Sequence, residues 1–377
     1  MRTISRGFGR AGVVAAFLGL TQAAGATDGV VGPGNCDEDG FEAVLAAVDG
    51  SGGGTITFDC GTATIPFENY KEIAHEVTID GGGRITFDGG NASAFFQVFF
   101  SADVTLKGLT LQHGIFSSAH ALENFGTLTL DHVRMSANVS SEPAVVNSGT
   151  MVVVASTFSG NISSLNGGAI NNAGTLLDVS SSTFEGNQAA NGAAIYSVAP
   201  LTVANSTFNA NAAGAGGGAI YQSDAGDASL VFVTAADNTA SFGAGVYKDA
   251  GNFEHAMTVG NSIFSGNATG NCDGVVTSSG YNLSDDTHCG AAFTGPGDVN
   301  DTPLPMQALG DHGGPTATMP PATGNPAIDH VPIGSCSPGV DQRGGGRPFG
   351  AACDSGAVEV GALADDVIFA DGFDPID

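Results

Sequence analysis

A six-residue segment recurs four times in this chain with a period of about 25 residues. It reads STFSGN at 156–161, STFEGN at 182–187, STFNAN at 206–211 and SIFSGN at 262–267. Each copy closes a unit of three short apolar segments separated by Gly, Asn and Ser, without helical periodicity. Three short strands and three turns per unit are typical of one coil of a parallel β-solenoid. The repeat therefore predicts an all-β chain wound as a right-handed parallel β-helix.

Two positions of the repeat carry side chains that successive coils would stack on one another. Because coils lie about 4.8 Å apart, equivalent residues of neighbouring coils face each other. The Phe position predicts an internal apolar column. The Asn position predicts a column of turn amides, because Asn tolerates the left-handed conformation and hydrogen-bonds turn backbone. The predicted columns are Met135, Phe158, Phe184, Phe208, Ala235 and Phe264, and Asn138, Asn161, Asn187, Asn211, Asn238 and Asn267.

Residues 55–120 read as less regular early coils, for example TITFDC at 55–60 and VTLKGLTLQHG at 104–114. Strand content and spacing predict about ten coils, or on the order of 45 Å of rod. An open solenoid end would expose strand edges. The segment 36–48 predicts a short capping helix for that end, because acidic residues begin it and apolar residues recur at helical spacing. The apolar positions of this helix are Phe41, Val44, Leu45 and Val48.

The N-terminal residues 1–26 have the features of a secretory signal peptide. Arg2, Arg6 and Arg10 precede an apolar run at 11–20 and a small-residue cleavage site. That run is too short to span a bilayer, and no later stretch approaches roughly 18 apolar residues, so we expect an exported protein that is not transmembrane. The net charge of −28 argues against nucleic acid and anionic membranes as partners.

The six cysteines fall into three pairs that are close in sequence. Export and an even count favour disulfides. Six cysteines allow 15 connectivities, and we predict local pairing because each pair encloses a segment of similar, short length. No spacing typical of a zinc site occurs. The predicted disulfides are Cys36–Cys60, Cys272–Cys289 and Cys336–Cys353.

The GGAI segments at 167–170 and 217–220, paired with Phe-x-x-Asn, resemble the repeat of polymorphic outer membrane proteins over roughly residues 115–270. That resemblance implies the right-handed β-helical passenger of a surface-exposed adhesin.

The C-terminal segments 271–290, 309–330 and 341–359 together resemble the choice-of-anchor Q domain of exported β-helical proteins. This resemblance implies export and surface sorting, and it transfers no catalytic residues. We expect Asp341, Arg343 and Arg347 to form an ion-paired knot inside this module. The predicted organisation is a signal peptide at 1–26, a β-helix with its N-terminal cap at 27–290, a choice-of-anchor Q-like module at 291–360 and an acidic tail at 361–377.

Many right-handed β-helices cleave polysaccharides, so an enzymatic alternative stays open. A pectate-lyase-like site needs carboxylates that hold Ca²⁺ and an Arg that acts as the base. The stretch DGGGRITFDGG places Asp80, Arg84 and Asp88 together, and Arg134 is a further candidate base. Turn carboxylates and solvated Arg side chains are the simpler interpretation of these four residues.

Three histidines, His113, His120 and His132, lie near Glu123 and Asp131 in the predicted coils. Such a set is compatible with metal binding or proton transfer, although surface histidines on a β-helix are the simpler interpretation. We predict no metal site and no cofactor, with Ca²⁺ required only by the enzymatic alternative.

Two functions therefore remain. The first is a non-enzymatic, adhesin-like protein of the prokaryotic surface or envelope, whose partner is a cell-surface glycan or protein. The second is a polysaccharide lyase or another glycan-active enzyme. An enzyme would show convergent carboxylates and a base along one sheet, whereas a rod would show polar ladders.

Overall fold

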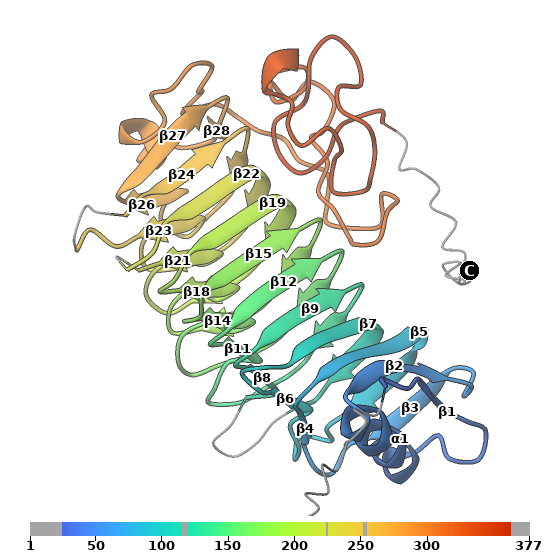
Figure 1. The fold of residues 1–377 in the computed structure, drawn as a ribbon. Helices are drawn as coiled ribbons and strands as arrows, with labels where there is room; N and C mark the ends of the chain where they lie inside the picture. Colours follow the sequence, from blue (N-terminus) through green and yellow to red (C-terminus); the bar gives the residue numbers. More distant parts are fainter. Residues whose placement is uncertain (1–24, 115–119, 224, 252–254, 363–377) are drawn as a thin grey trace, which may run out of the picture.

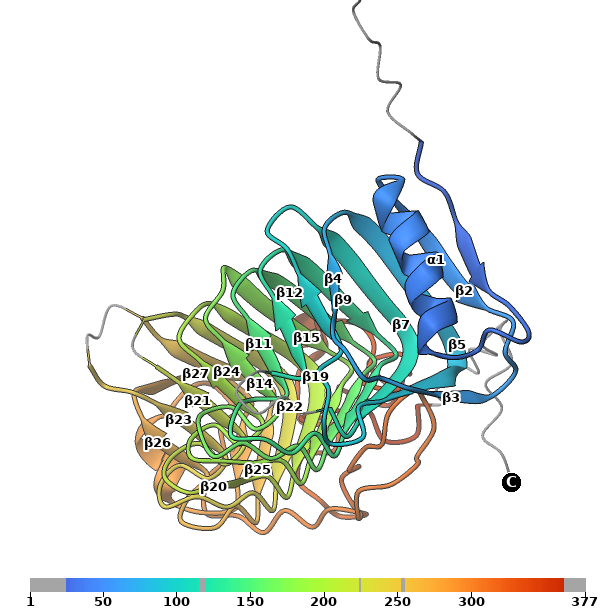
Figure 2. The same ribbon diagram turned by 90° about the horizontal axis from the view of Figure 1, so that it is seen from below.

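The computed structural model describes residues 25–114, 120–223, 225–251 and 255–362, and they form a parallel β-helix (Figures 1 and 2). Residues 1–24 and 363–377, which hold most of the predicted signal peptide and acidic tail, lie outside the described residues. Each coil contributes one strand to sheet B, and the described chain has nine such strands, close to the predicted ten coils. The predicted fold class is confirmed.

Sheet A runs along two walls of the rod, and sheet B forms the third. Within the described residues, sheet A has 17 strands: β1 Gly29–Val31, β2 Gly53–Phe58, β3 Ala63–Pro66, β5 Glu76–Asp88, β7 Asp103–Gln112, β9 Thr127–Asp131, β10 Arg134–Ser136, β12 Thr150–Val154, β13 Thr157–Ser159, β15 Leu176–Ser180, β16 Thr183–Glu185, β19 Leu201–Asn209, β22 Ala228–Ala236, β24 Met257–Gly260, β25 Ile263–Ser265, β27 Val276–Gly280 and β28 Leu283–Ser284.

The strands of sheet B are β4 Lys71–Ile73, β6 Phe96–Val98, β8 Leu122–Asn124, β11 Val145–Asn147, β14 Ile170–Asn172, β18 Ile195–Ser197, β21 Ile220–Gln222, β23 Val246–Lys248 and β26 Cys272–Gly274. A two-stranded sheet of β17 Gln188–Ala189 and β20 Ala212–Ala213 lies at a turn.

A residue in the left-handed conformation bends sheet A between its two walls in successive coils. Such residues include Ala155 (φ 49°), Ser181 (φ 49°), Asn205 (φ 45°) and Phe232 (φ 53°). Left-handed backbone costs a residue other than Gly about 1–2 kcal/mol, so stacking between coils must offset this strain. The bend gives each coil the corner that it needs to close around a core.

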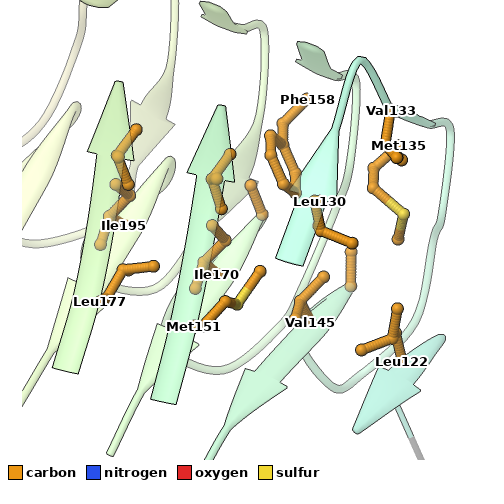
Figure 3. Packing of buried hydrophobic residues seen from close by; sticks show 14 of the residues in the cluster. Leu122, Leu130, Val133, Met135, Val145, Met151, Phe158, Ile170, Leu177 and Ile195 are labelled. Carbon is orange, nitrogen blue, oxygen red and sulfur yellow. The ribbon is translucent and has the colours of Figure 1, made fainter. Parts of the chain in front are cut away.

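The core fills the interior of the coil, because alternate residues of each strand point inward. Figure 3 shows the side chains of Leu130, Met151, Phe158, Ile170 and others meeting between the sheets. Buried positions recur coil after coil in one continuous apolar cluster. In the short strands of sheet B, the outer two residues are buried and only the middle one faces outward, as in β18 and β21.

The predicted capping helix is α1, Glu38–Gly50, which covers the N-terminal end of the rod (Figure 2). The Asp37 side chain caps it by accepting from the Gly40 amide at 2.9 Å. Phe41 is fully buried, and its ring centroid lies 5.0 Å from that of Phe87 in the second coil. Lys71 clamps the helix to β4 by donating to Glu38 (2.7 Å) and Glu42 (2.6 Å). The cap is thus held to the rod by apolar packing against the core and by ion pairs with Lys71.

The C-terminal residues 291–362 fold back along sheet A, where Figure 1 shows them in orange and red beside the last coils. Thr183 donates to the Ala317 carbonyl at 2.6 Å, and Thr207 donates to Oε1 of Gln342 at 2.6 Å. The Ala357 amide donates to Oγ1 of Thr234 at 2.9 Å. Since Thr183 and Thr207 are fully buried, this segment covers the outer wall of three successive coils.

Three disulfides pair the cysteines locally: Cys36–Cys60, Cys272–Cys289 and Cys336–Cys353, with Cα–Cα distances of 5.8, 4.9 and 6.0 Å. The 3-10 helix η1, His288–Ala291, carries Cys289, and a second one, η2, spans Ile333–Ser335. Among the described residues, no helix has the length and apolar character needed to cross a bilayer.

Candidate functional site

The six predicted asparagines form one hydrogen-bonded column along the rod. In each link, Nδ2 of one Asn donates to Oδ1 of the next: 2.8 Å from Asn138 to Asn161, and 2.9 Å from Asn161 to Asn187. Three further links of 2.9 Å run from Asn187 through Asn211 and Asn238 to Asn267. Each amide also satisfies backbone; Nδ2 of Asn187, for example, donates to the Phe158 carbonyl at 3.0 Å. The column therefore bonds coil to coil and leaves its amides no capacity for a ligand.

The predicted aromatic column packs inside the rod. The rings of Phe158 and Phe184 lie 4.8 Å apart and within 3° of parallel, and Phe184 and Phe208 repeat this geometry at 4.8 Å and 4°. Met135, Ala235 and Phe264 occupy the same register in neighbouring coils. All are buried and none faces solvent.

A second amide ladder was missed by sequence reasoning. On sheet B, Nδ2 of Asn124 donates to Asn147 (2.7 Å), Asn147 to Asn172 (2.8 Å) and Asn172 to Oγ of Ser197 (2.9 Å). The Asn-x-Gly segments at 147–149 and 172–174 were a usable signal for this ladder, because an Asn two residues before a Gly can accept a hydrogen bond from the turn backbone. The Gly149 amide indeed donates to Oδ1 of Asn147.

A hollow of about 340 Å³ opens beside the first two complete coils. Its lining includes Asp59, Asp80 and Arg84 together with Gly81 and Gly82. Lys107 from the next coil lies 3.5 Å from Oδ2 of Asp80. Two carboxylates and two cations thus share one exposed corner, a set able to bind a charged group or to polarise one.

The other two candidate catalytic residues lie apart from this hollow. The Asp88 carboxylate binds Gln112 Nε2 (2.9 Å), the Gly90 amide (2.9 Å) and Nδ1 of His113 (3.1 Å). Burial alone would raise the pKa of Asp88, but these hydrogen bonds hold it below the usual value. Exposed Arg134 donates to Oγ of Ser159 at 3.3 Å. The structure therefore brings Asp80 and Arg84 together, while Asp88 and Arg134 take part in separate hydrogen bonds.

The three histidines that we considered for metal binding or proton transfer do not converge. His113 pairs with Asp88, and His132 pairs with the adjacent Asp131. His120 sits partly buried, and burial lowers its pKa. His113 and His132 thus each pair with a different carboxylate, and they form two separate surface pairs.

The C-terminal residues hold a buried ionic network that was only partly foreseen. Arg343 pairs with Asp341 at 2.8 Å, as expected, but Arg347 pairs with Glu359 at 2.9 Å. The side chains of Arg347 and Glu359 are both fully buried. Arg347 also lies 4.1 Å from the ring centroid of Phe232, so the network reaches the bend of β22.

Asp354 completes this network by accepting from the amides of Asp329 (2.7 Å) and Val360 (2.6 Å). Burial, together with the charge of Glu359, raises the pKa of Asp354 to about 6, against the lowering effect of these hydrogen bonds and Arg347. The sequence signal was the presence of two Arg and three acidic residues within 341–359, which indicates ion pairing but not its partners.

Across the described ranges, no group of three His, Cys, Asp or Glu side chains is arranged to hold a metal ion. Comparison with protein-family models, with curated proteins and with solved structures gives no match for this chain.

Proposed function

We propose that this chain is an exported, non-catalytic β-helical protein of a prokaryotic surface or envelope, which acts as an adhesin-like rod. One observation supports the proposal most directly. The Asn and Phe side chains that recur in the repeat hydrogen-bond to or stack on their counterparts in neighbouring coils. Asn187 and Phe184 each meet their counterpart in the next coil and are fully buried. Because the recurring side chains serve the stacking of coils, the result is a stiff scaffold. The side chains that point outward from its sheets are then available to form a binding face.

Further features support export and surface attachment. Three disulfides are typical of an oxidising, extracellular compartment, and residues 1–26 have the features of a signal peptide. Within the proposal, residues 27–290 are the rod with polymorphic-outer-membrane-protein-like repeats. Residues 291–360 are the choice-of-anchor Q-like module and 361–377 an acidic tail. The net charge of −28 favours a neutral or cationic partner.

Two measurements test the proposal. The full chain and a chain without residues 1–26 are expressed in a bacterium, and surface exposure is measured by protease shaving; only the full chain is expected at the surface. Purified residues 27–377 are incubated with a panel of polysaccharides and with intact cells. We expect retention on cells or glycan without release of reducing or unsaturated ends. Absence from the surface, or rapid product release, would contradict the proposal.

The hollow favours one second candidate, a polysaccharide lyase or related glycan-active enzyme. Asp59 and Asp80 would be the residues available to a Ca²⁺ ion there, and Arg84 the candidate base beside them. This candidate predicts Ca²⁺-dependent product that disappears in both Asp80→Asn and Arg84→Ala. The matched control is Arg134→Ala, which changes an exposed Arg outside the hollow. Product lost in the first two variants and kept in the control would replace the rod proposal with the enzyme.

A further inference from the structure

The outer face of sheet B is a single column of side chains, because only the middle residue of each three-residue strand points outward. Through the central coils this column reads Asn171, Tyr196, Tyr221, Tyr247 and Asp273, each in register with the next. Towards the N-terminus the same column holds polar and charged residues such as Glu72 and Gln97. Three successive coils therefore place tyrosines side by side on a half-exposed face.

The aromatic rings of this face form a corner rather than a flat stack. The centroids of Tyr221 and Tyr247 lie 4.8 Å apart with planes at 46°. Phe242 meets Tyr247 at 4.8 Å and 63°, edge to face. Gly216 makes room for this arrangement, since a Cβ there would approach the Phe242 ring to 2.2 Å. The rings of Phe242 and Tyr247 thus form the two sides of a half-exposed corner on the surface.

Two carboxylates flank this corner. The Tyr221 hydroxyl donates to Oδ2 of Asp249 at 3.4 Å, and Asp273 follows Tyr247 in register. Burial together with the charges of Asp249 and Asp273 raises the pKa of Tyr247. Neither carboxylate forms a salt bridge among the residues that the structure describes. The neighbouring Lys248 is turned inward, and its Nζ donates to the buried Ser223 carbonyl at 2.7 Å.

Rings and carboxylates together are complementary to an organic cation. A cation over an aromatic face is attracted by the ring's negative face, and the attraction is stronger when the cation is desolvated. A guanidinium group suits this corner best, because its plane stacks on a ring while its N–H groups reach a carboxylate. We propose that the face made by Tyr221, Phe242, Tyr247, Asp249 and Asp273 binds an arginine-bearing basic segment of a polypeptide partner. This inference rests on the proposed adhesin-like function and names the class of its partner.

The test is titration of purified residues 27–377 with a tetra-arginine peptide at 150 mM salt, followed by calorimetry and by tyrosine fluorescence. Tyrosine emission is a usable signal because the chain has no Trp and only five Tyr. We expect Tyr247→Leu to weaken binding about five- to tenfold and Asp273→Asn to weaken it about threefold or more. Tyr247→Phe, which keeps the ring, is expected to bind as tightly as the unchanged protein. Unaltered thermal midpoints confirm that the variants are folded.

The matched control is Glu72→Gln, which removes the same charge from the same outward column at the far end of the rod. It should leave binding within about twofold. Equal weakening by Glu72→Gln and Asp273→Asn would reduce the effect to non-specific attraction by a protein of charge −28 and overturn the inference.

Binding of choline with no binding of the peptide would also overturn it, because the ligand would then be a small quaternary ammonium compound. Failure of peptide binding by a protein that reaches the surface contradicts this inference alone. Failure to reach the surface with peptide binding intact contradicts only the proposed function.

Discussion

The central coils and the C-terminal segment are both held by buried polar groups, but of opposite kinds. From Asn138 to Asn267 the coils are joined by neutral amides, and every link repeats the one before it at 2.8–2.9 Å. The C-terminal segment is joined by charges that occur once, with Arg347, Glu359 and Asp354 all buried. Loss of one neutral link leaves its neighbours short of a hydrogen bond, whereas loss of one buried ion leaves its partner's charge without a counter-ion, which costs more.

This contrast predicts where the molecule is fragile. An amide ladder distributes stability over the rod, as expected for stacked repeats whose interactions are mainly with nearest neighbours. The ionic network concentrates stability in one place and couples it to pH, because carboxylates titrate and amides do not. The C-terminal segment should therefore detach before the coils unfold.

The largest effect is expected for Arg347→Met. Arg347 donates to Glu359 (2.9 Å) and to the carbonyls of Asp354 (2.9 Å) and Gly356 (2.7 Å). Its removal leaves Glu359 buried without its cation, at a cost of about 3–5 kcal/mol. Hydrogen exchange should show amides of 341–360 losing protection while those near Asn161 keep theirs. The control Arg134→Met changes an exposed Arg. Equal protection of 341–360 in the two variants would show that the ionic network does not hold the C-terminal segment in place.

A smaller effect is expected for Asn187→Ala, which breaks one link of the ladder. The variant leaves the Phe158 carbonyl, Asn161 and Asn211 short of a hydrogen bond, which should cost about 1–3 kcal/mol. Gln188→Ala is the matched control, because Gln188 is the next residue and is exposed. The two variants are compared by their urea midpoints of unfolding. Equal midpoints would show that the ladder contributes nothing measurable.

Sequence reasoning found the parts of this contrast that the repeat spells out. The period fixed the coil, and the Phe and Asn positions follow from it because equivalent residues of stacked coils face each other. The ladder on sheet B was missed because Asn124, Asn147 and Asn172 change to Ser197 and then Gln222, so the column loses its signature halfway. Glu359 was missed because Arg347 reaches it across a loop, and no periodicity relates two residues that each occur once.

The pH dependence should separate the two regions next. The pKa of Asp354 in the folded protein is about 6, above the value near 3.9 of an unfolded chain. The folded segment therefore binds more protons between about pH 4 and pH 6. The contribution of Asp354 to stability is fully present below that window and is lost as the pH rises through about 6. Lowering the pH from 7 to 5 should thus slow proteolysis of residues 341–360, by at most about tenfold per pH unit for one proton.

Asp354→Asn supplies the control for this titration, because an amide has no proton to gain. Carboxylates such as Asp88, whose pKa is lowered, act in the opposite direction, so the difference between the two proteins is the informative quantity. Identical pH profiles would mean that Asp354 does not titrate in this window. In both proteins, cleavage near Asn187 should stay slow across the range.

The smallest effect concerns the residue before each ladder Asn, which must adopt the left-handed conformation. Gly occupies this position in three of the six coils, as Gly160 (φ 62°), Gly186 (φ 62°) and Gly266 (φ 68°). The other three residues are Ala137 (φ 52°), Ala210 (φ 55°) and Asp237 (φ 57°). The left-handed conformation costs Ala about 1–2 kcal/mol, and replacing Ala with Gly removes this cost. The greater chain entropy of Gly in the unfolded state reduces the benefit by about 0.5–1 kcal/mol. Ala210→Gly should therefore stabilise the rod by about 0.5–1 kcal/mol.

Gly186→Ala is the reverse change on the neighbouring coil, and it should destabilise the rod by a similar amount. An added Cβ at Gly186 meets no atom within 4 Å, so the loss would report backbone conformation alone. Ala210 is exposed, so little burial is lost when its methyl group is removed. Thermal midpoints should move in opposite directions by about 2 °C each. Shifts of the same sign would show that side-chain contacts, and not backbone conformation, decide stability at these positions. The left-handed turn before each Asn would then not explain why the repeat contains Gly there.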